Sequence, residues 1–139
     1  MNERTLAIIK PDAMAARRAG AILSMIEEAG FRIRAMRLVR LTRAQAEGFY
    51  AVHREKPFFE SLCRFMTEGP VIVMVLEGEG AIQRWRDLMG PTDPAKAPEG
   101  TVRRLYGTNI ERNAVHGSDG PETARLEVSY FFPGMDLVE

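Results

Sequence analysis

Residues 113–119 read Asn-Ala-Val-His-Gly-Ser-Asp and place one of the chain's two histidines directly before a glycine. An imidazole titrates near neutral pH, so His116 can offer a free lone pair and can carry a transferred group covalently. Gly117 has no side chain to block approach to the ring. His116 is therefore the best candidate nucleophile in the chain, and the alternative is an ordinary histidine in a turn.

The residues after this histidine predict the start of a helix. Asp119 and Glu122 have the spacing of a capping box, and Pro121 falls in the expected first turn. Backbone N–H groups at such a terminus favour a nearby anion, including phosphate. We therefore expect a helix from about Pro121 to Leu126 and an anionic substrate beside it.

A phosphate site also needs cationic donors. The sequence contains no glycine-rich phosphate loop, so side chains must bind any phosphate. The candidates in loops or at the ends of elements are Lys10, His53, Arg86, Thr92 and Arg103. Each has an ordinary alternative as a solvated charge, a turn residue or a residue at a helix end.

Two neighbouring phenylalanines could serve a nucleobase. Phe58 and Phe59 precede Leu62 at a spacing that turns one ring outward and one inward. An outward ring could stack on any base, because every base has a π-face. The alternative is a pair of core residues on an amphipathic helix.

The elements that must position these residues follow from hydrophobic periodicity. Apolar runs predict strands, helical spacing predicts helices, and Gly30 is expected at a helix end. Lys10 ends the first strand, which places it at a rim of the sheet. The expected strands are 5–9, 31–41 with one wet face and a bulge, 71–76 and a short one at the motif histidine; the expected helices are 22–30, 43–52, 58–66, 81–89 and 121–126.

This order predicts an α+β fold. With the extra helices treated as insertions, it reads βαββαβ, which is a ferredoxin-like antiparallel sheet covered by helices. Residues 90–100 contain Pro91, Pro94 and Pro98 and predict an inserted proline-rich loop. Long loops in compact domains are often functional.

Composition limits the function classes. The length suits one domain over residues 1–139, and the formal net charge of zero gives no sign of a nucleic-acid or membrane partner. Cys63 is the only cysteine, which excludes an intrachain disulfide and a zinc cluster built from thiols. No apolar run is long enough for a signal peptide or a membrane span. We therefore expect a cytoplasmic protein.

Taken together, the motifs resemble nucleoside diphosphate kinases of the bacterial type. The resemblance runs from about Arg4 to Phe132. The motifs that carry it, in the family's order, are Lys10-Pro11-Asp12, Tyr50 with Lys56-Pro57-Phe58-Phe59, Gly69-Pro70-Val71, Arg86 with Thr92, Thr101-Val102-Arg103, and Asn113 to Asp119.

The resemblance implies a reaction. His116 would take the γ-phosphoryl group from a nucleoside triphosphate and pass it to a nucleoside diphosphate in a ping-pong cycle with broad base tolerance. Glu127 matches the carboxylate that orients the imidazole, with Ser118 beside it; its alternative is a surface glutamate on a helix. Lys10 and Tyr50 complete the implied catalytic group.

The resemblance also implies where a nucleotide would bind. The matched positions are Arg86, Thr92 and Arg103 for the phosphates, Lys10 and Asn113 for the sugar hydroxyls, Tyr50 and His53 for the phosphate end, and Phe58, Leu62 and Ile110 for the base. Arg104-Leu105 departs from the small or acidic pair usual after this arginine, which would alter loop packing beside the cleft mouth.

The implied cofactor is Mg²⁺ that arrives with the nucleotide, with Asp119 reaching its water shell and no protein-only metal site. The implied partners are ribo- and deoxyribonucleoside di- and triphosphates and further copies of the chain, in a tetramer or hexamer built from dimers. No membrane or nucleic acid is required.

Other classes remain alternatives. A ferredoxin-like RNA-binding or regulatory module would show recognition aromatics on the sheet, and no such string lies near Tyr106 or Tyr130. A nucleotide-binding relative without transfer would lack the histidine, lysine or arginine positions, all of which are filled. A phosphatase that uses phosphohistidine would carry its own motif around the histidine.

Overall fold

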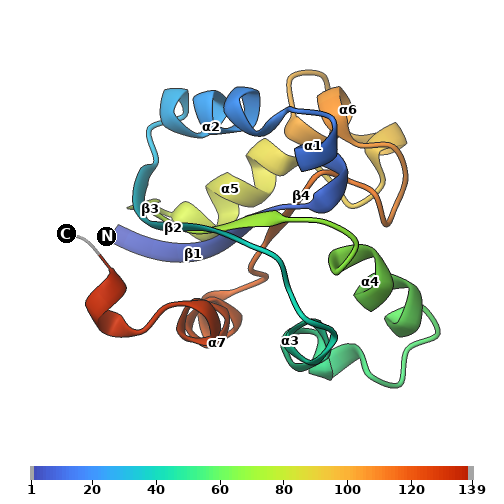
Figure 1. Cartoon of the computed structure of the whole chain (residues 1–139). Coiled ribbons are helices and arrows are strands. Elements are labelled where there is room, and N and C mark those ends of the chain that lie inside the picture. The colour runs from blue at the N-terminus through green and yellow to red at the C-terminus, as the bar shows by residue number, and fades with distance from the viewer. Residues whose placement is uncertain (1, 138–139) are drawn as a thin grey trace.

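A four-stranded antiparallel sheet lies between two layers of helices in the computed structural model, which describes residues 2–137 (Figure 1). The strands run in the order β2-β3-β1-β4, as a ferredoxin-like fold requires. Their bounds are β1 Asn2–Ile9, β2 Arg32–Val39, β3 Val71–Glu79 and β4 Val115–Gly117. The α+β class and the antiparallel sheet are as the sequence predicted.

The two inner strands have apolar centres because both of their faces are covered there. Residues 6–9 of β1 and 73–76 of β3 are buried without alternation, which is the pattern of a strand packed on two sides. These strands pair from Asn2 opposite Glu79 to Ile9 opposite Ile72. β2 lies at an edge and has a register shift between Ile33 and Ala35, which confirms the expected bulge.

Helices on each face enclose a separate apolar cluster. The first cluster includes Trp85, Ile22 and Met74, and the second core cluster includes Phe65 and Leu6. Figure 1 shows the helices of the first face above the sheet and those of the second below it. The first group is α1 Pro11–Ala15, α2 Ala19–Glu28, α5 Ala81–Met89 and α6 Val102–Tyr106; the second is α3 Arg43–Phe49, α4 Phe59–Met66 and α7 Pro121–Phe131.

Short 3₁₀ turns complete the chain at Ala51–His53, Pro94–Lys96 and Gly134–Asp136. The second of these lies within the predicted proline-rich loop, where Asp93 accepts a hydrogen bond from the Ala95 N–H at 3.0 Å. No helix in the described part of the chain has the length and apolar character needed to cross a membrane.

The helix after the motif histidine differs from its prediction. Its N-cap is Gly120, and no side chain caps it, so the predicted capping box of Asp119 and Glu122 is wrong. Asp119 instead accepts a hydrogen bond from Arg86 at 2.7 Å. The helix also continues to Phe131, beyond the predicted end at Leu126, because Val128 and Phe132 bury apolar surface in the second cluster.

Helices α1 and α6 were not expected from the sequence. Each has five residues, which is too short for an apolar periodicity. Pro11 occupies the first turn of α1, where its missing N–H costs nothing. Thr101 caps α6 by accepting the Arg104 N–H. These two helices place Lys10 and Arg103 beside the same end of β4.

Candidate active site

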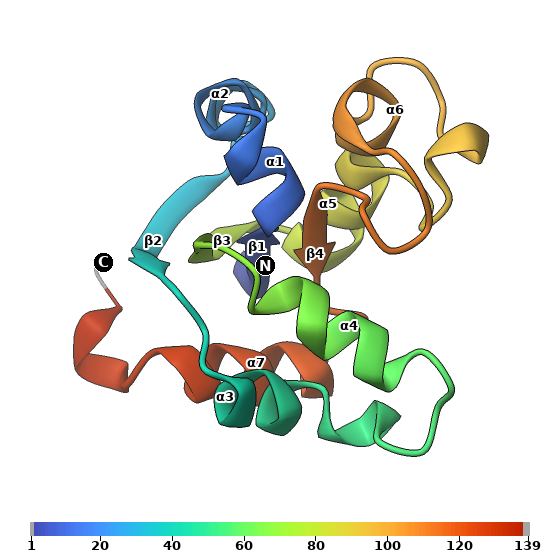
Figure 2. The ribbon, with the colours of Figure 1, turned by 45° about the vertical axis from the view of Figure 1, so that its right-hand side comes forward.

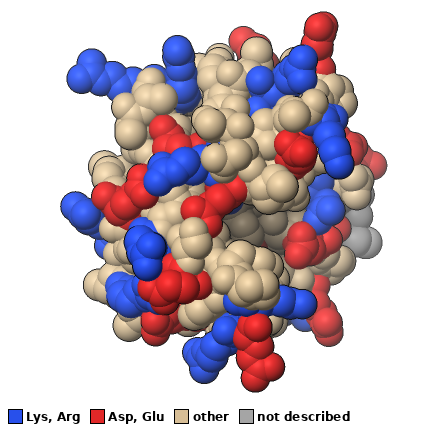
Figure 3. All heavy atoms as spheres, turned by 90° about the vertical axis from the view of Figure 1, so that its right-hand side faces the viewer, with Lys and Arg blue, Asp and Glu red and all other residues tan. Residues whose placement is uncertain are grey.

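A pocket of about 750 Å³ opens between α4 on one side and α5, α6 and the 90–100 loop on the other. Figure 2 shows β4 between these two groups of helices, and Figure 3 shows the hollow, with charged side chains around its mouth. The predicted site residues that line the pocket are Lys10, Tyr50, His53, Phe58, Leu62, Arg86, Thr92, Arg103, Ile110, Asn113, His116 and Asp119. Positions far apart in the sequence therefore converge on one cavity.

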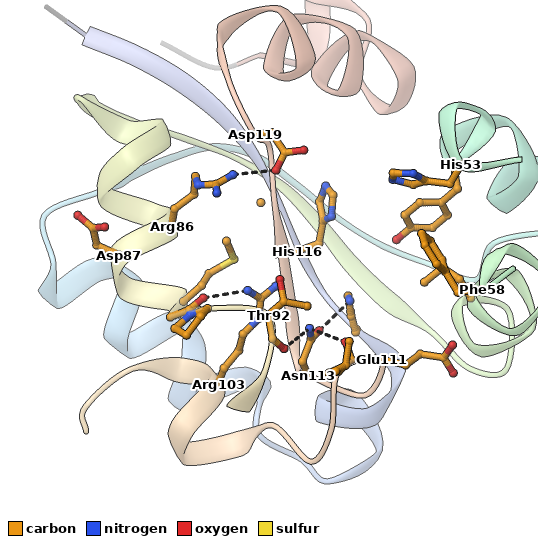
Figure 4. A pocket seen from close by; sticks show the side chains of 18 of the residues that line it. His53, Phe58, Arg86, Asp87, Thr92, Arg103, Glu111, Asn113, His116 and Asp119 are labelled. Atoms are coloured by element: carbon orange, nitrogen blue, oxygen red, sulfur yellow. Dashed lines mark hydrogen bonds and ion pairs between the residues drawn. The ribbon is translucent and has the colours of Figure 1, made fainter. Parts of the chain in front are cut away.

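His116 lies at the centre of this arrangement. It is the middle residue of β4, where it pairs with Ile8 of β1, so the sheet fixes its backbone. Figure 4 shows its ring between the Arg86 and Asp119 side of the pocket and the His53 and Phe58 side. The side chain is 19% exposed, which leaves it accessible to a small molecule in the pocket.

Glu127 and Ser118 lie behind the histidine. The Nε2 atom of His116 is 2.9 Å from Oε1 of Glu127, and the same oxygen accepts the Ser118 hydroxyl at 2.8 Å. Ser118 Oγ in turn accepts the Leu6 N–H at 3.3 Å, so β1 anchors the network. Because the Glu127 side chain is only 16% exposed, the alternative of a surface glutamate is wrong.

Trp85 supports the same strand from the opposite side, a contact that the sequence did not reveal. Its indole N–H donates to the carbonyl oxygen of His116 at 3.1 Å. A Cβ on Gly117 would lie 2.6 Å from Trp85 Cδ1 and 2.7 Å from Met89 Cε. Gly117 is therefore needed for close packing against α5, as well as lining the pocket.

Lys10 and Asn113 form a buried polar pair on the pocket wall. The Lys10 ammonium donates to Asn113 Oδ1 at 2.8 Å, and the Asn113 amide donates to the carbonyl oxygens of Thr92 at 3.0 Å and Ile110 at 2.9 Å. Burial, followed by the charge of Arg103, lowers the pKa of Lys10 from 10.5 to about 8. The ammonium is thus destabilised until an anion arrives.

Two arginines enter the pocket with different degrees of restraint. Arg103 is buried and donates to the carbonyl oxygens of Gly90 at 2.9 Å and Val115 at 2.8 Å. Burial and the nearby Arg86 lower its pKa to about 10, so it stays charged at neutral pH. Arg86 is more exposed and donates to Asp119 at 2.7 Å. Figure 4 shows both beside Thr92 and His116.

The opposite end of the pocket is apolar. Phe58 is 47% exposed and Ile110 is 63% exposed, and Leu62 lines the wall with them. Phe59 instead packs against the second core cluster, which confirms that one ring points outward and one inward. His53 lies between this wall and Tyr50, since its ring centroid is 5.4 Å from that of Phe58 and 6.5 Å from that of Tyr50.

Tyr50 lies next to His116 in the pocket wall. Its ring is 6.4 Å from that of His116 in an edge-on arrangement, and burial raises the pKa of its hydroxyl above the ordinary value. Among residues 2–137 that hydroxyl has no hydrogen-bond partner. A buried hydroxyl facing a pocket is available to a ligand, since an unpaired polar group is otherwise unfavourable.

Other lining residues had no sequence signal. Gln83 and Asp87 come from the exposed face of α5, and Glu111 comes from the loop before β4. Within the described residues, no group of three histidine, cysteine, aspartate or glutamate side chains is arranged to bind a metal ion. Cations and hydrogen-bond donors thus surround His116, and apolar groups form the far wall.

Comparison with known proteins identifies the family. The family profile described as nucleoside diphosphate kinase matches residues 3–137. A nucleoside diphosphate kinase of Syntrophotalea carbinolica is 61% identical over 136 residues, covering 98% of this chain and 99% of the relative. One from Nitratidesulfovibrio vulgaris is 56% identical over 138 residues, covering 99% of each chain.

Solved structures agree. The nucleoside diphosphate kinase of Aquifex aeolicus superposes with a TM-score of 0.97 at 45% identity, over 99% of this chain and 100% of that one. The halophilic enzyme of Halobacterium salinarum, solved in complex with CDP, gives 0.96 at 37% identity, over 100% of this chain and 93% of that one. The chain therefore belongs to the nucleoside diphosphate kinase family, whose members transfer phosphate between nucleotides.

Proposed function

We propose that this chain moves the γ-phosphoryl group of a nucleoside triphosphate to a nucleoside diphosphate through a phosphohistidine at Nδ1 of His116. The observation that carries the proposal is the 2.9 Å contact between His116 Nε2 and Glu127. An ionised carboxylate only accepts hydrogen bonds, so Nε2 holds the ring proton and Nδ1 holds the lone pair. The nucleophilic nitrogen is therefore Nδ1.

The reaction has two halves that use the same pocket. In the first, Nδ1 forms a bond to the γ-phosphorus while the bond from that phosphorus to the bridging oxygen breaks, and the nucleoside diphosphate leaves with the electron pair. Glu127 stabilises the positive charge that develops on the ring. In the second half, a terminal phosphate oxygen of the acceptor attacks the phosphorus, and the ring nitrogen leaves as neutral imidazole.

We assign the phosphates to Arg86, Thr92 and Arg103. Phosphoryl transfer depends on neutralising charge spread over the phosphate oxygens and on aligning the attack. The two carbonyl contacts of Arg103 hold its guanidinium in place before the substrate binds. Lys10 and Asn113 are assigned to the sugar hydroxyls, and Tyr50 and His53 to the phosphate end.

The base is assigned to the apolar wall of Phe58, Leu62 and Ile110. Such a wall holds a base by its faces, whereas discrimination between bases needs hydrogen bonds to their edges. Broad base tolerance follows from this. We also propose that both ribonucleotides and deoxyribonucleotides serve as donors and acceptors.

The family uses a divalent cation, and we propose Mg²⁺ that binds with the nucleotide. Asp119 stands at the pocket mouth with its side chain 83% exposed, and its carboxylate offers the oxygen donors that Mg²⁺ prefers. A single exposed carboxylate fits a cation whose other ligands are phosphate oxygens and water. When bound, it neutralises phosphate charge.

The proposal includes one domain over the whole chain and an assembly of copies, either a tetramer or a hexamer built from dimers. Edge strand β2 carries Met36 at 50% and Leu38 at 66% exposure, which is apolar surface that another copy could cover. Native mass spectrometry distinguishes the two assemblies. The cytoplasmic location stays a prediction from composition.

Initial-rate kinetics with ATP and varied GDP test the proposal. Parallel double-reciprocal lines are expected, because the donor product leaves before the acceptor binds. His116→Ala should abolish transfer while nucleotide binding is retained. Transfer by this variant at the wild-type rate would refute the assignment, and converging lines would indicate direct transfer without a phosphoenzyme.

A further inference from the structure

The residue two positions before His116 has an unusual backbone. Ala114 has a φ of +75°, in the left-handed region that side chains rarely adopt, and it is fully buried. Within residues 2–137 the only other non-glycine residue with positive φ is Arg17, which is exposed between α1 and α2. A strained conformation next to a reactive histidine persists only where the surroundings hold it.

Two residues of the segment after β1 hold this backbone from both sides. The N–H of Ala114 donates to Asp12 Oδ2 at 3.0 Å, and its carbonyl oxygen accepts the Lys10 N–H at 2.8 Å. The angle between the N–H and the C=O of one residue depends on its φ and ψ. The Val115 N–H also donates to the Asn113 carbonyl oxygen at 2.9 Å, which closes a γ-turn at Ala114. These three hydrogen bonds together hold the positive φ of Ala114.

Ala114 connects the parts of the site that must be aligned. Asn113, directly before it, is bonded to Lys10 and to the carbonyl oxygens of Thr92 and Ile110. Val115, directly after it, offers its carbonyl oxygen to Arg103. If Ala114 relaxed to a right-handed or extended conformation, the chain would leave it in another direction on both sides.

The surroundings of Asp12 disfavour the ionised form of its side chain. Its Oδ1 atom is buried and has no hydrogen-bond partner among the described residues. Burial raises the pKa of Asp12, although the N–H groups of Ala114 and Ala13 act in the opposite direction. Helix α1, whose first turn contains Asp12, has only five residues and gains little from a negative charge at its start.

We propose that Asp12 is a positioning residue for phosphoryl transfer: its carboxylate is the side-chain restraint that, with the backbone bonds of this turn, holds Ala114 at positive φ and so sets the directions of Asn113 and His116. The kinetic part of this inference rests on the proposed function. The structural part does not, since it concerns the conformation of Ala114 in the free protein.

The experiment compares four variants and one control variant with the wild type in single-turnover phosphorylation by ATP. Asp12→Ala should slow phosphoenzyme formation about 10- to 100-fold, the scale expected for a small misplacement of reacting groups. The Kd for ADP should change much less. Asp12→Asn keeps an acceptor for the Ala114 N–H and should stay within about threefold of wild type.

Ala114→Gly supplies the decisive comparison. Glycine adopts positive φ without a steric cost, so it needs no restraint from Asp12. Ala114→Gly alone should be close to wild type, and Asp12→Ala with Ala114→Gly should regain most of the lost rate. A general loss of stability in Asp12→Ala would not be repaired in this way.

Amide hydrogen exchange gives a readout that does not depend on activity. The Ala114 N–H should exchange slowly in the wild type and Asp12→Asn and faster in Asp12→Ala. Glu3→Ala is the matched control, because Glu3 also accepts a backbone N–H, that of Ile82, at 2.9 Å and away from the pocket. It should leave both the rate and Ala114 exchange unchanged.

Three results would overturn the inference: an Asp12→Ala rate equal to wild type, an Asp12→Asn loss as large as that of Asp12→Ala, or no recovery on adding Ala114→Gly. The second result would assign Asp12 a role through its charge. Failure of wild-type protein to form any phosphoenzyme would refute the proposed function instead, and the exchange of Ala114 would still decide the structural part.

Discussion

His116 and Glu127 are eleven residues apart in the chain, on β4 and α7, and their Nε2 and Oε1 atoms are 2.9 Å apart. The contact arises because α7 begins at Pro121, with three residues between the strand and the helix, and its second turn passes back behind the histidine. The helix thus supplies a fixed acceptor to the ring nitrogen that faces away from the pocket.

Removing this acceptor should slow transfer more than it weakens binding. Glu127→Ala is expected to lower kcat about 10- to 100-fold, the range typical when a functional histidine that binds a metal ion loses its hydrogen-bond partner. Ser118→Ala should lower kcat by a smaller factor, because Glu127 still accepts a hydrogen bond from His116. Steady-state kinetics check both, and a Glu127→Ala enzyme with wild-type kcat would contradict the role of Glu127.

Nucleotide binding should take up a proton above pH 8. The pKa of Lys10 is about 8 in the free protein, so the amine is increasingly neutral above that pH, whereas an arriving phosphate favours the charged ammonium. Calorimetry in buffers of different ionisation enthalpy measures the uptake at pH 8.5 to 9. Lys10→Arg should abolish it, since arginine stays protonated. Equal proton uptake by wild type and Lys10→Arg would show that a group other than Lys10 takes up the proton.

The same shift predicts how Lys10 affects stability. Its pKa is about 8 in the folded protein and 10.5 by reference in the unfolded chain, so between these values the unfolded chain binds more protons. The contribution of Lys10 to the free energy of unfolding therefore rises with pH across this window. Denaturant titrations at pH 8 and 10 should show the free energy of unfolding of wild type rising relative to that of Lys10→Met as the pH increases. An unchanged or falling relative value would contradict the lowered pKa of Lys10.

Gly117→Ala should destabilise the fold and displace the histidine. Its Cβ would lie 2.6 Å from Trp85 Cδ1, and the rigid indole cannot move aside without breaking its bond to the His116 carbonyl. We expect a loss of about 1–3 kcal/mol, typical of overpacking, together with reduced kcat. Gly134→Ala is the control, because nothing lies within 4 Å of its added Cβ and it caps none of the described α-helices. Equal unfolding midpoints for the two variants would contradict the packing argument.

Phe58→Ala should weaken all nucleoside diphosphates by a similar amount. Loss of one stacking ring is expected to cost about 1–3 kcal/mol whichever base is bound. Val52→Ala, another exposed apolar residue outside this pocket, should have no effect. Fluorescence titrations with ADP, GDP and CDP measure the change. A loss confined to one base would indicate recognition of a base edge.

The sheet and the larger helices could be predicted because their signals are local. The apolar run of residues 5–9, the bulge in the 31–41 strand and the helix at 81–89 all correspond to observed elements. Gly30 has a φ of +92°, as its expected place after a helix requires. The capping box at Asp119 failed because Arg86, distant in sequence, binds that carboxylate.

The site was predicted as a group of positions that included Glu127 and Ser118 behind the histidine, but two further supports were not predicted. Trp85, which holds the His116 carbonyl, and Asp12, which holds Ala114, act across 31 and 102 positions of sequence. A tryptophan on a helix and an aspartate after a proline have ordinary local explanations. The positive φ of Ala114 has no sequence signal at all, because alanine gives no hint of it.

The most direct test of the central claim is to identify the phosphorylated atom. Wild-type protein is incubated with γ-labelled ATP and Mg²⁺ without acceptor, the labelled protein is isolated, and unlabelled GDP is added. The account predicts an alkali-stable, acid-labile label on His116 Nδ1, identified by NMR and by its absence from His116→Ala, and transfer of that label into GTP. Label on Nε2 or on another residue, or label that GDP does not remove, would contradict it.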